Sequence, residues 1–265
     1  MPSSPTERAA GARRTLKALA GLALLVLTFE ALRVTGALPS TSVPSTAAIL
    51  DALATSVREG DMGAAVGNTA LAWLGGLLLA CAIGIPLGIV VGLSDLADSA
   101  TERAVEVLRP IPAVALVPMA IVLFDIDLGM QVFLIAIACV WPLLLGTRGG
   151  VRAVDPQQID TARSFGLSSV ATVRRVVLPA SVPSIATALR LSASLGVVVA
   201  VGAQLISGSP GLGSLLVSSQ NADRNDVVWA CLLVTGVFGV TINLLLAAAE
   251  RGVAGWQELS TEGRR

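Results

Sequence analysis

The chain has 265 residues, of which 54% are hydrophobic and 14% are charged, and its 18 basic residues balance its 18 acidic residues. A soluble domain carries about 25% charged residues, so the composition favours a membrane protein and argues against a soluble enzyme. There is no His, no closely spaced pair of Cys, no Gly-x4-Gly-Lys phosphate loop and no basic patch with aromatic residues. The sequence therefore predicts no cofactor, no metal site, no nucleic-acid partner and no ATP site of its own.

Long apolar runs predict an all-α membrane protein with about six transmembrane helices, because a helix needs about 20 apolar residues to cross a bilayer. In chain order the expected spans are 16–35, 69–93, 108–124, 128–145, 185–206 and 227–249. The remaining regions are an N-terminal tail at 1–15, an external segment at 36–68 and a C-terminal tail at 251–265. The core at 69–250 contains a polar loop at 147–184.

The first apolar run also resembles a signal peptide, because Arg13, Arg14 and Lys17 precede it. The run continues past Phe29 without a clean small-x-small cleavage site, so we expect it to remain as a span.

Lys and Arg are distributed unequally between the two sides of the expected topology. With the N-terminus inside, only Arg33, Arg58 and Arg224 of the 18 basic residues fall outside. The positive-inside rule therefore places both termini and the 147–184 loop in the cytoplasm. The external segment is expected to form a short helix after Pro44 along the outer surface.

Gly and Pro are frequent inside the expected second and third spans. Small residues allow helices to approach closely, whereas kinked helices can line a pathway that rearranges. Both explanations remain open for these residues: Gly75, Gly76, Gly84, Pro86, Gly88, Gly92, Pro110, Pro112 and Pro118.

The polar loop begins with a predicted short helix. Asp155-Pro156 is a favourable helix start, with Pro in the first turn. The helix is expected over 157–165 and ends at Gly166, because Gly readily adopts the left-handed conformation of a helix terminus.

A second helix is expected after this turn. Ser168 and Ser169 can cap it, and it is expected to run through Val177. Pro179 should then end regular hydrogen bonding, and Pro183 should direct the chain into the fifth span. The loop therefore predicts a rigid two-helix elbow.

The motifs in and around this loop resemble those of a known family. Asp160-Thr161-Ala162, then Gly166 and Val177-Leu178-Pro179, resemble the EAA loop of ABC importer permeases. Three further matches follow the order of the family's "RP-P-ALLP", "G-R-VDP" and "S-GLG" motifs: Arg109-Pro110-Ile111-Pro112 with Leu116-Val117-Pro118, 150–156, and 209–213. The combination is similar to the nitrate/sulfonate/taurine branch and covers about 69–250.

Three positions depart from the family pattern. Asp160 stands where Glu is usual, Thr161 stands where Ala is usual, and Gln204 stands where relatives often carry an acidic residue. The first two changes keep an acid and a small neighbour, whereas the third weakens any analogy of substrate.

The resemblance implies a type I ABC importer permease fold with a cytoplasmic coupling helix in the bacterial inner membrane. The chain would be a non-catalytic subunit that lets a small anion of the nitrate/sulfonate/taurine kind cross the membrane. Implied partners are cytoplasmic ABC ATPase subunits, a second permease copy in a homodimer, an external solute-binding protein that delivers the substrate, and membrane lipids. ATP binding would push the loops together and shift the population of spans from inward-facing to outward-facing.

The resemblance also assigns roles in the ATPase-coupling loop. Ala162 should be small to fit against the partner, Gly166 should permit the turn, and Leu178-Pro179 should brace the elbow against the spans. The charged residues could pair with the ATPase, pair within the elbow or be solvated. The full set is Asp160, Thr161, Ala162, Arg163, Gly166, Arg174, Arg175, Leu178 and Pro179.

Polar side chains in apolar spans are candidates for the translocation pathway, because they are costly there. Ser can instead bond to its own helix backbone, and Asn or Gln can bond between helices. The candidates are Glu30, Asn68, Ser192, Ser194, Gln204 and Asn243. Arg190, near the inner end of the fifth span, is expected to snorkel to the headgroups, with an anion contact as the alternative.

Two other functions remain open at this stage. A permease of the same fold could import a vitamin precursor or another neutral or cationic solute. A stand-alone secondary transporter would need internal repeats and ion-coupling carboxylates in its spans, and Glu30 is the one strong carboxylate candidate.

Overall fold

The computed structural model describes residues 20–21, 24, 27–35 and 42–262, and within them the chain is helical with no strand. Part of the expected first span, 16–35, lies outside these residues, and its described end, 27–34, is helical. The remaining elements are α2 Thr46–Glu59, α3 Asp61–Leu93, α4 Asp95–Leu108, η1 Ala113–Leu116, α5 Val117–Phe124, α6 Leu128–Arg152, α7 Pro156–Ser164, α8 Ser169–Thr172, η2 Val173–Val177, α9 Leu178–Ser207, α10 Leu212–Asn221 and α11 Asn225–Glu262.

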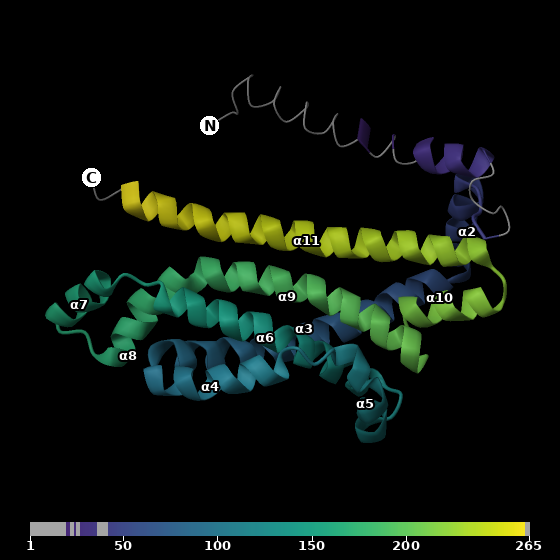
Figure 1. Ribbon diagram of the computed structural model, residues 1–265. Coiled ribbons are helices and arrows are strands. Elements are labelled where there is room, and N and C mark those ends of the chain that lie inside the picture. Colours follow the sequence, from purple (N-terminus) through teal and green to yellow (C-terminus); the bar gives the residue numbers. More distant parts are fainter. Residues whose placement is uncertain (1–19, 22–23, 25–26, 36–41, 263–265) are drawn as a thin grey trace, which may run out of the picture.

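Four long helical runs form an elongated bundle. α3, α6, α9 and α11 run along its long axis, with α7 and α8 at one end and α2 and α10 at the other (Figure 1). These runs are long and apolar enough to cross a membrane, and the described chain has up to five spans if the bent pair of α4 with η1 and α5 counts as one. The all-helical membrane fold expected from the sequence is therefore confirmed.

Small residues allow α3 and α6 to touch backbone to backbone. Every fourth residue of α3 on this face is Gly or Ala: Gly76, Ala80, Gly84, Gly88 and Gly92. A Cβ atom added at Gly88 would lie 2.6 Å from the Leu144 carbonyl oxygen, and one at Gly84 would lie 2.9 Å from Leu143 Cβ. Close packing therefore accounts for these glycines.

The third span differs from the expected continuous helix at 108–124. α4 ends at Leu108, and the run from η1 into α5 is bent from it by 75°. Pro110 and Pro112 explain the break, because proline lacks an N–H donor and restricts the residue before it. The residues before 108 form α4, so Arg103 lies on a helix that runs back along the bundle and Arg109 directly follows it (Figure 1).

The helix after the elbow also differs from expectation, because Pro179 does not end it. Helical structure is continuous over Ser169–Ser207 through the π-helical turn η2. The Leu178 N–H donates to the Val173 carbonyl, five residues back. This wider turn leaves room for the ring of Pro179, which could not donate an ordinary helical bond. Pro183 lies inside α9 and does not redirect the chain.

Candidate functional site

The first helix of the elbow is defined by hydrogen bonds at both of its ends. At the start of α7 the Gln157 N–H donates to Asp155 Oδ1 at 2.9 Å. At its end Gly166 has φ +77°, and the Leu167 N–H donates to the Ala162 carbonyl at 3.1 Å. This is a left-handed helix terminus of the kind that favours Gly. The structure therefore contains the turn expected at Gly166.

The second helix of the elbow begins at the expected cap. The Ala171 N–H donates to Ser168 Oγ at 3.3 Å. Val177, at the end of η2, is buried against Val151 and Val154 at the end of α6. Leu178 is only half-buried and Pro179 is exposed. Val177, adjacent to Leu178-Pro179, thus makes an apolar contact between the elbow and the end of α6.

Ala162 is buried within the chain itself. Ala162 is 6% exposed, so the packing of the elbow itself requires a small residue there. Thr161 is exposed, and its hydroxyl donates to the Gln157 carbonyl at 2.7 Å. The motif residues therefore divide into one that packs inward and one that faces outward.

The charged residues of the elbow lie on its surface. Arg163 Nη1 lies 3.6 Å from Asp160 Oδ1, one helical turn away, and both side chains are exposed. Such a pair contributes at most about 1 kcal/mol. Arg174 and Arg175 are exposed, and in the described part of the chain neither forms an ion pair. These four side chains are available to a partner.

Two exposed apolar side chains lie beside the turn, and the sequence reasoning missed both. Phe165 is 81% exposed and Val170 is 77% exposed. An aromatic residue directly before the turn glycine of a polar loop is the signal that could have identified Phe165. The tip of the elbow, defined here as residues 160–170, therefore combines apolar and charged groups.

Ion pairs at the base of the elbow join α4 to α6. Arg148 Nη2 lies 2.8 Å from Asp98 Oδ2, and Arg152 Nη2 lies 2.7 Å from Asp95 Oδ1. Arg152 also lies 3.1 Å from Asp98, whose side chain is only 14% exposed. Arg152 is the last residue of α6, so the chain leaves this cluster directly into the elbow.

Gln204 lies in a buried hydrogen-bond network at the other end of the bundle. Its amide donates to Gln131 Oε1 at 2.8 Å, while its own Oε1 accepts from the Thr69 hydroxyl and the Gly213 N–H, both at 3.1 Å. The Thr69 hydroxyl also accepts from the Leu212 N–H at 2.9 Å. Bonding between α3, α6, α9 and α10 therefore accounts for Gln204.

The two serine candidates of α9 also bond within the protein. Ser192 is buried, and its hydroxyl donates to the Cys139 carbonyl of α6 at 3.1 Å. Ser194 is exposed, and its hydroxyl donates to the Arg190 carbonyl in the preceding turn at 3.1 Å.

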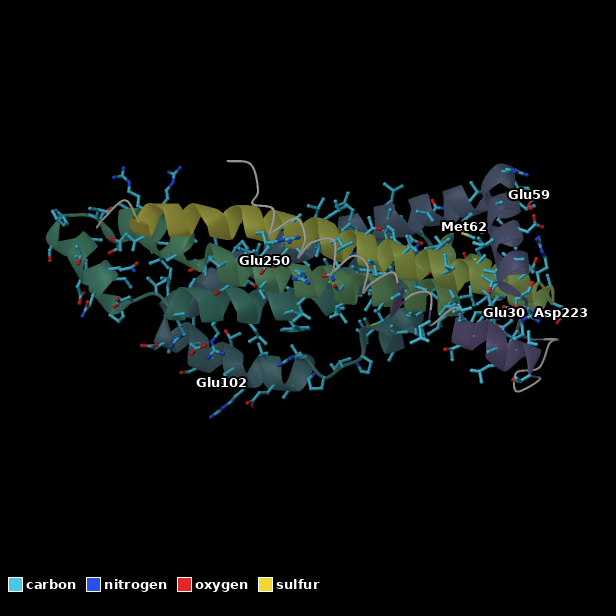
Figure 2. The ribbon with its side chains drawn as sticks, turned by 90° about the horizontal axis from the view of Figure 1, so that it is seen from above. Glu30, Glu59, Met62, Glu102, Asp223 and Glu250 are labelled. Carbon is cyan, nitrogen blue, oxygen red and sulfur yellow. The ribbon has the colours of Figure 1, made fainter. Side chains whose placement is uncertain are left out.

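Arg190, for which snorkelling or an anion contact was expected, pairs with α11 in the structure. Its Nε donates to Asn243 Oδ1 at 2.6 Å, and its Nη1 lies 3.4 Å from Glu250 Oε2. Glu250 also accepts from the Thr187 hydroxyl at 2.7 Å. Glu250 lies where α11 runs beside α9 (Figure 2). Because α11 offers a carboxylate and an amide, the guanidinium has charged and polar partners on that helix.

Glu30 and Asn68 lie toward the end of the bundle opposite the elbow. Glu30 (Figure 2) accepts from Arg33 Nε and from the Thr46 hydroxyl, both at 3.1 Å, which ties it to the start of α2. Asn68 borders a hollow of about 550 Å³ between α3 and α10, together with Asp61, Ser214, Ser218 and Asn221. The structure does not gather the six pathway candidates into one site, because Glu30, Ser192, Gln204 and Asn243 are bonded within the chain in separate places.

Comparison with known proteins identifies the family and the fold of this chain. The profile of the family described as "Binding-protein-dependent transport system inner membrane component" matches residues 84–255. A chain of the MetNI methionine ABC transporter in an inward-facing conformation superposes with a TM-score of 0.63 at 18% sequence identity, covering 71% of this chain and 94% of that chain. The structural likeness shows the fold.

Curated relatives include transport permeases from several organisms. A "Probable ABC transporter permease protein" of Brucella abortus is 31% identical over 247 residues, which cover 91% of this chain and 98% of that protein. A taurine transport system permease protein of Escherichia coli is 32% identical and covers 68% of this chain and 66% of its own length. A nitrate import permease protein of Leptolyngbya laminosa is 31% identical and covers 64% of this chain and 61% of its own length.

Proposed function

This chain belongs to the family of binding-protein-dependent transport system inner membrane components, and from this membership we propose how it works as an ABC importer permease. Its substrate is a small oxyanion of the nitrate, sulfonate or taurine kind, which an external binding protein delivers. Both termini and the elbow lie in the cytoplasm, where ABC ATPase subunits grip the elbow. Two copies of the chain enclose the pathway, and the chain itself performs no bond chemistry.

The elbow tip is the observation that supports the ATPase contact. Exposed Phe165 and Val170 provide apolar area for a groove, while Asp160, Arg163 and the arginines of η2 provide charge around it. Interfaces combine such a buried apolar anchor with a polar rim. The π-helical turn then joins this surface directly to α9, so a push on the elbow reaches a membrane span.

The names of the relatives support the substrate class. Proteins named for nitrate import and for taurine transport match this chain at 31% and 32% identity. Nitrate and the sulfonate group of taurine share a compact set of equivalent oxygens around one central atom. We therefore expect uptake of taurine, an alkanesulfonate or nitrate in vesicles that contain the permease, its ATPase and its binding protein. Uptake confined to a cationic vitamin precursor would contradict this substrate class.

Replacement of Phe165 by Ser tests the ATPase contact. Full burial of a Phe side chain is worth about 1.5–3 kcal/mol, so the affinity of the permease for its ATPase should fall by about tenfold or more. The measurement is the amount of ATPase retained by the tagged permease after co-expression and washing at increasing salt. Phe165→Leu is the matched control, because it preserves an apolar anchor and should retain most of the ATPase. Equal retention by Phe165→Ser and the native chain would count against the elbow as the contact.

A further inference from the structure

The direction of α4 relative to the spans is the first of three observations that point to a water-filled vestibule. Ser94 alone separates α4 from the end of α3, so the chain reverses and α4 returns alongside the bundle. Both views show α4 running along the long axis (Figures 1 and 2). The ion pairs of Asp95 and Asp98 with α6 fix its start at the elbow end. From there its 14 residues rise about 21 Å, at 1.5 Å per residue.

The surface of α4 is sharply divided between charged and apolar residues, which is the second observation. At 100° per residue, all its charged residues and Arg109 fall within an arc of about 140°. The opposite arc is mostly apolar, and although Ala97 and Thr101 there are half-buried, Leu96 is 83% and Val107 is 71% exposed. Val105 is the one buried residue of the helix. One edge of α4 thus packs on the protein, while its two broad faces differ in polarity.

The charges beyond the ion-pair cluster are the third observation. Glu102, labelled in Figure 2, is exposed, and so are Arg103, Glu106 and Arg109. Within the described residues none of these four belongs to an ion pair. An ionised side chain at membrane depth costs several kcal/mol unless it meets water or a partner. A helix that rises along the spans cannot present this arc to lipid.

We propose that the charged arc of α4 lines a water-filled vestibule that enters the membrane from the elbow end, while its apolar arc faces lipid. The proposal rests on the proposed function, under which the elbow end is cytoplasmic and the vestibule is the exit half of the translocation pathway. Two acids and two bases form this wall, namely Glu102, Glu106, Arg103 and Arg109. Because their charges balance, the wall hydrates the route and does not select the sign of the solute.

Two adjacent residues of equal depth provide the matched test. Glu106→Cys places a thiol on the charged arc and Val107→Cys places one on the apolar arc, in full-length chains whose Cys81, Cys139 and Cys231 are replaced by Ser. The probe is a charged, membrane-impermeant methanethiosulfonate applied to vesicles open to the reagent on both sides. The thiol at 106 should react at least ten times faster than the thiol at 107. Equal rates at the two positions would overturn the water-lined wall.

A depth measurement separates a vestibule wall from an amphipathic helix that lies flat on the membrane surface. A fluorescent label is attached at Leu96→Cys or Val107→Cys, and its quenching is compared in lipids brominated at shallow and at deep acyl positions. The label at 107 should lie deeper than the label at 96 by about 16 Å, the rise of 11 helical residues. Equal depths would overturn the proposal in favour of a surface helix. Neither measurement needs the ATPase, so the vestibule wall is tested independently of the proposed contact between the elbow and the ATPase.

Discussion

Gly166→Val is expected to leave the permease in the membrane and to uncouple ATP hydrolysis from transport. Gly166 has φ +77°, and a Cβ atom at this position would meet nothing within 4 Å, so the effect arises from the backbone alone. The left-handed conformation costs an ordinary L-residue roughly 1–2 kcal/mol, and a β-branched residue more. The turn should therefore relax and move α7 relative to α8. Uptake by reconstituted vesicles should fall by at least about tenfold, a 1.4 kcal/mol effect, while the ATPase continues to hydrolyse ATP.

Two control variants identify the cause of this loss. Gly166→Asn should retain most of the transport activity, because Asn tolerates the left-handed region better than other side chains do. Gly149→Val, in the last turns of α6, adds the same side chain where a Cβ atom likewise meets nothing within 4 Å and φ is helical, so it should also transport. A Gly166→Val permease that transports at the native rate would refute the role of the turn.

Gly88→Leu is expected to prevent stable packing of α3 against α6. Even the Cβ atom of Ala at this position would lie 2.6 Å from the Leu144 carbonyl oxygen and from Thr147 Cβ. Backbone cannot rotate away as a side chain can, so the two helices must separate along their contact. Overpacking a core typically costs about 1–3 kcal/mol of stability. Because Leu adds four carbons, the loss of stability in Gly88→Leu should exceed that range. The yield of monodisperse protein in gel filtration and its melting temperature in detergent measure the effect.

A second glycine of a long apolar helix serves as the control for Gly88. Gly236 lies on α11, and an added Cβ atom there would meet nothing within 4 Å. Gly236→Leu should therefore leave the melting temperature within a few degrees of the native chain. If both variants melted alike, the close approach of α3 and α6 would not be what stabilises the bundle.

The order of apolar spans and the turn of the elbow could be predicted because each depends on local signals. The lengths of the apolar runs in the sequence predicted the spans that the structure contains as α3, α6, α9 and α11. Asp155, Gly166 and Ser168 marked caps and a turn through chemistry that operates within a few residues. The motif resemblance added the family, which the profile match and the relatives confirm.

Local signals did not predict where the helices of the third and fifth spans break or continue. Pro110 and Pro179 both signal a helix end, yet the helix stops before the first and continues through the second. The difference depends on whether a wider turn can accommodate the ring, which the surrounding packing decides. The sequence analysis assigned no element to the residues that form α4, although the 100° spacing of their charges is that of one face of a helix.

The hydrogen-bond partners of the intramembrane polar residues also could not be predicted from the sequence. Gln204 meets Gln131 and Thr69, which lie 73 and 135 residues away in the chain. Arg190 meets Glu250 across 60 residues. Polarity in an apolar run shows that a partner is needed, but only the packing of the helices decides whether that partner is protein or solute.

The ion pairs of Asp95 and Asp98 with Arg148 and Arg152 have a mechanical consequence. They attach the foot of α4 to the last turn of α6, and α6 continues into the elbow within a few residues. The elbow is thus connected to the spans along two routes, one through the π-helical turn into α9 and the other through these ion pairs into α4. Under the proposed function, a movement of the ATPase subunits would therefore displace α9 and α4 together.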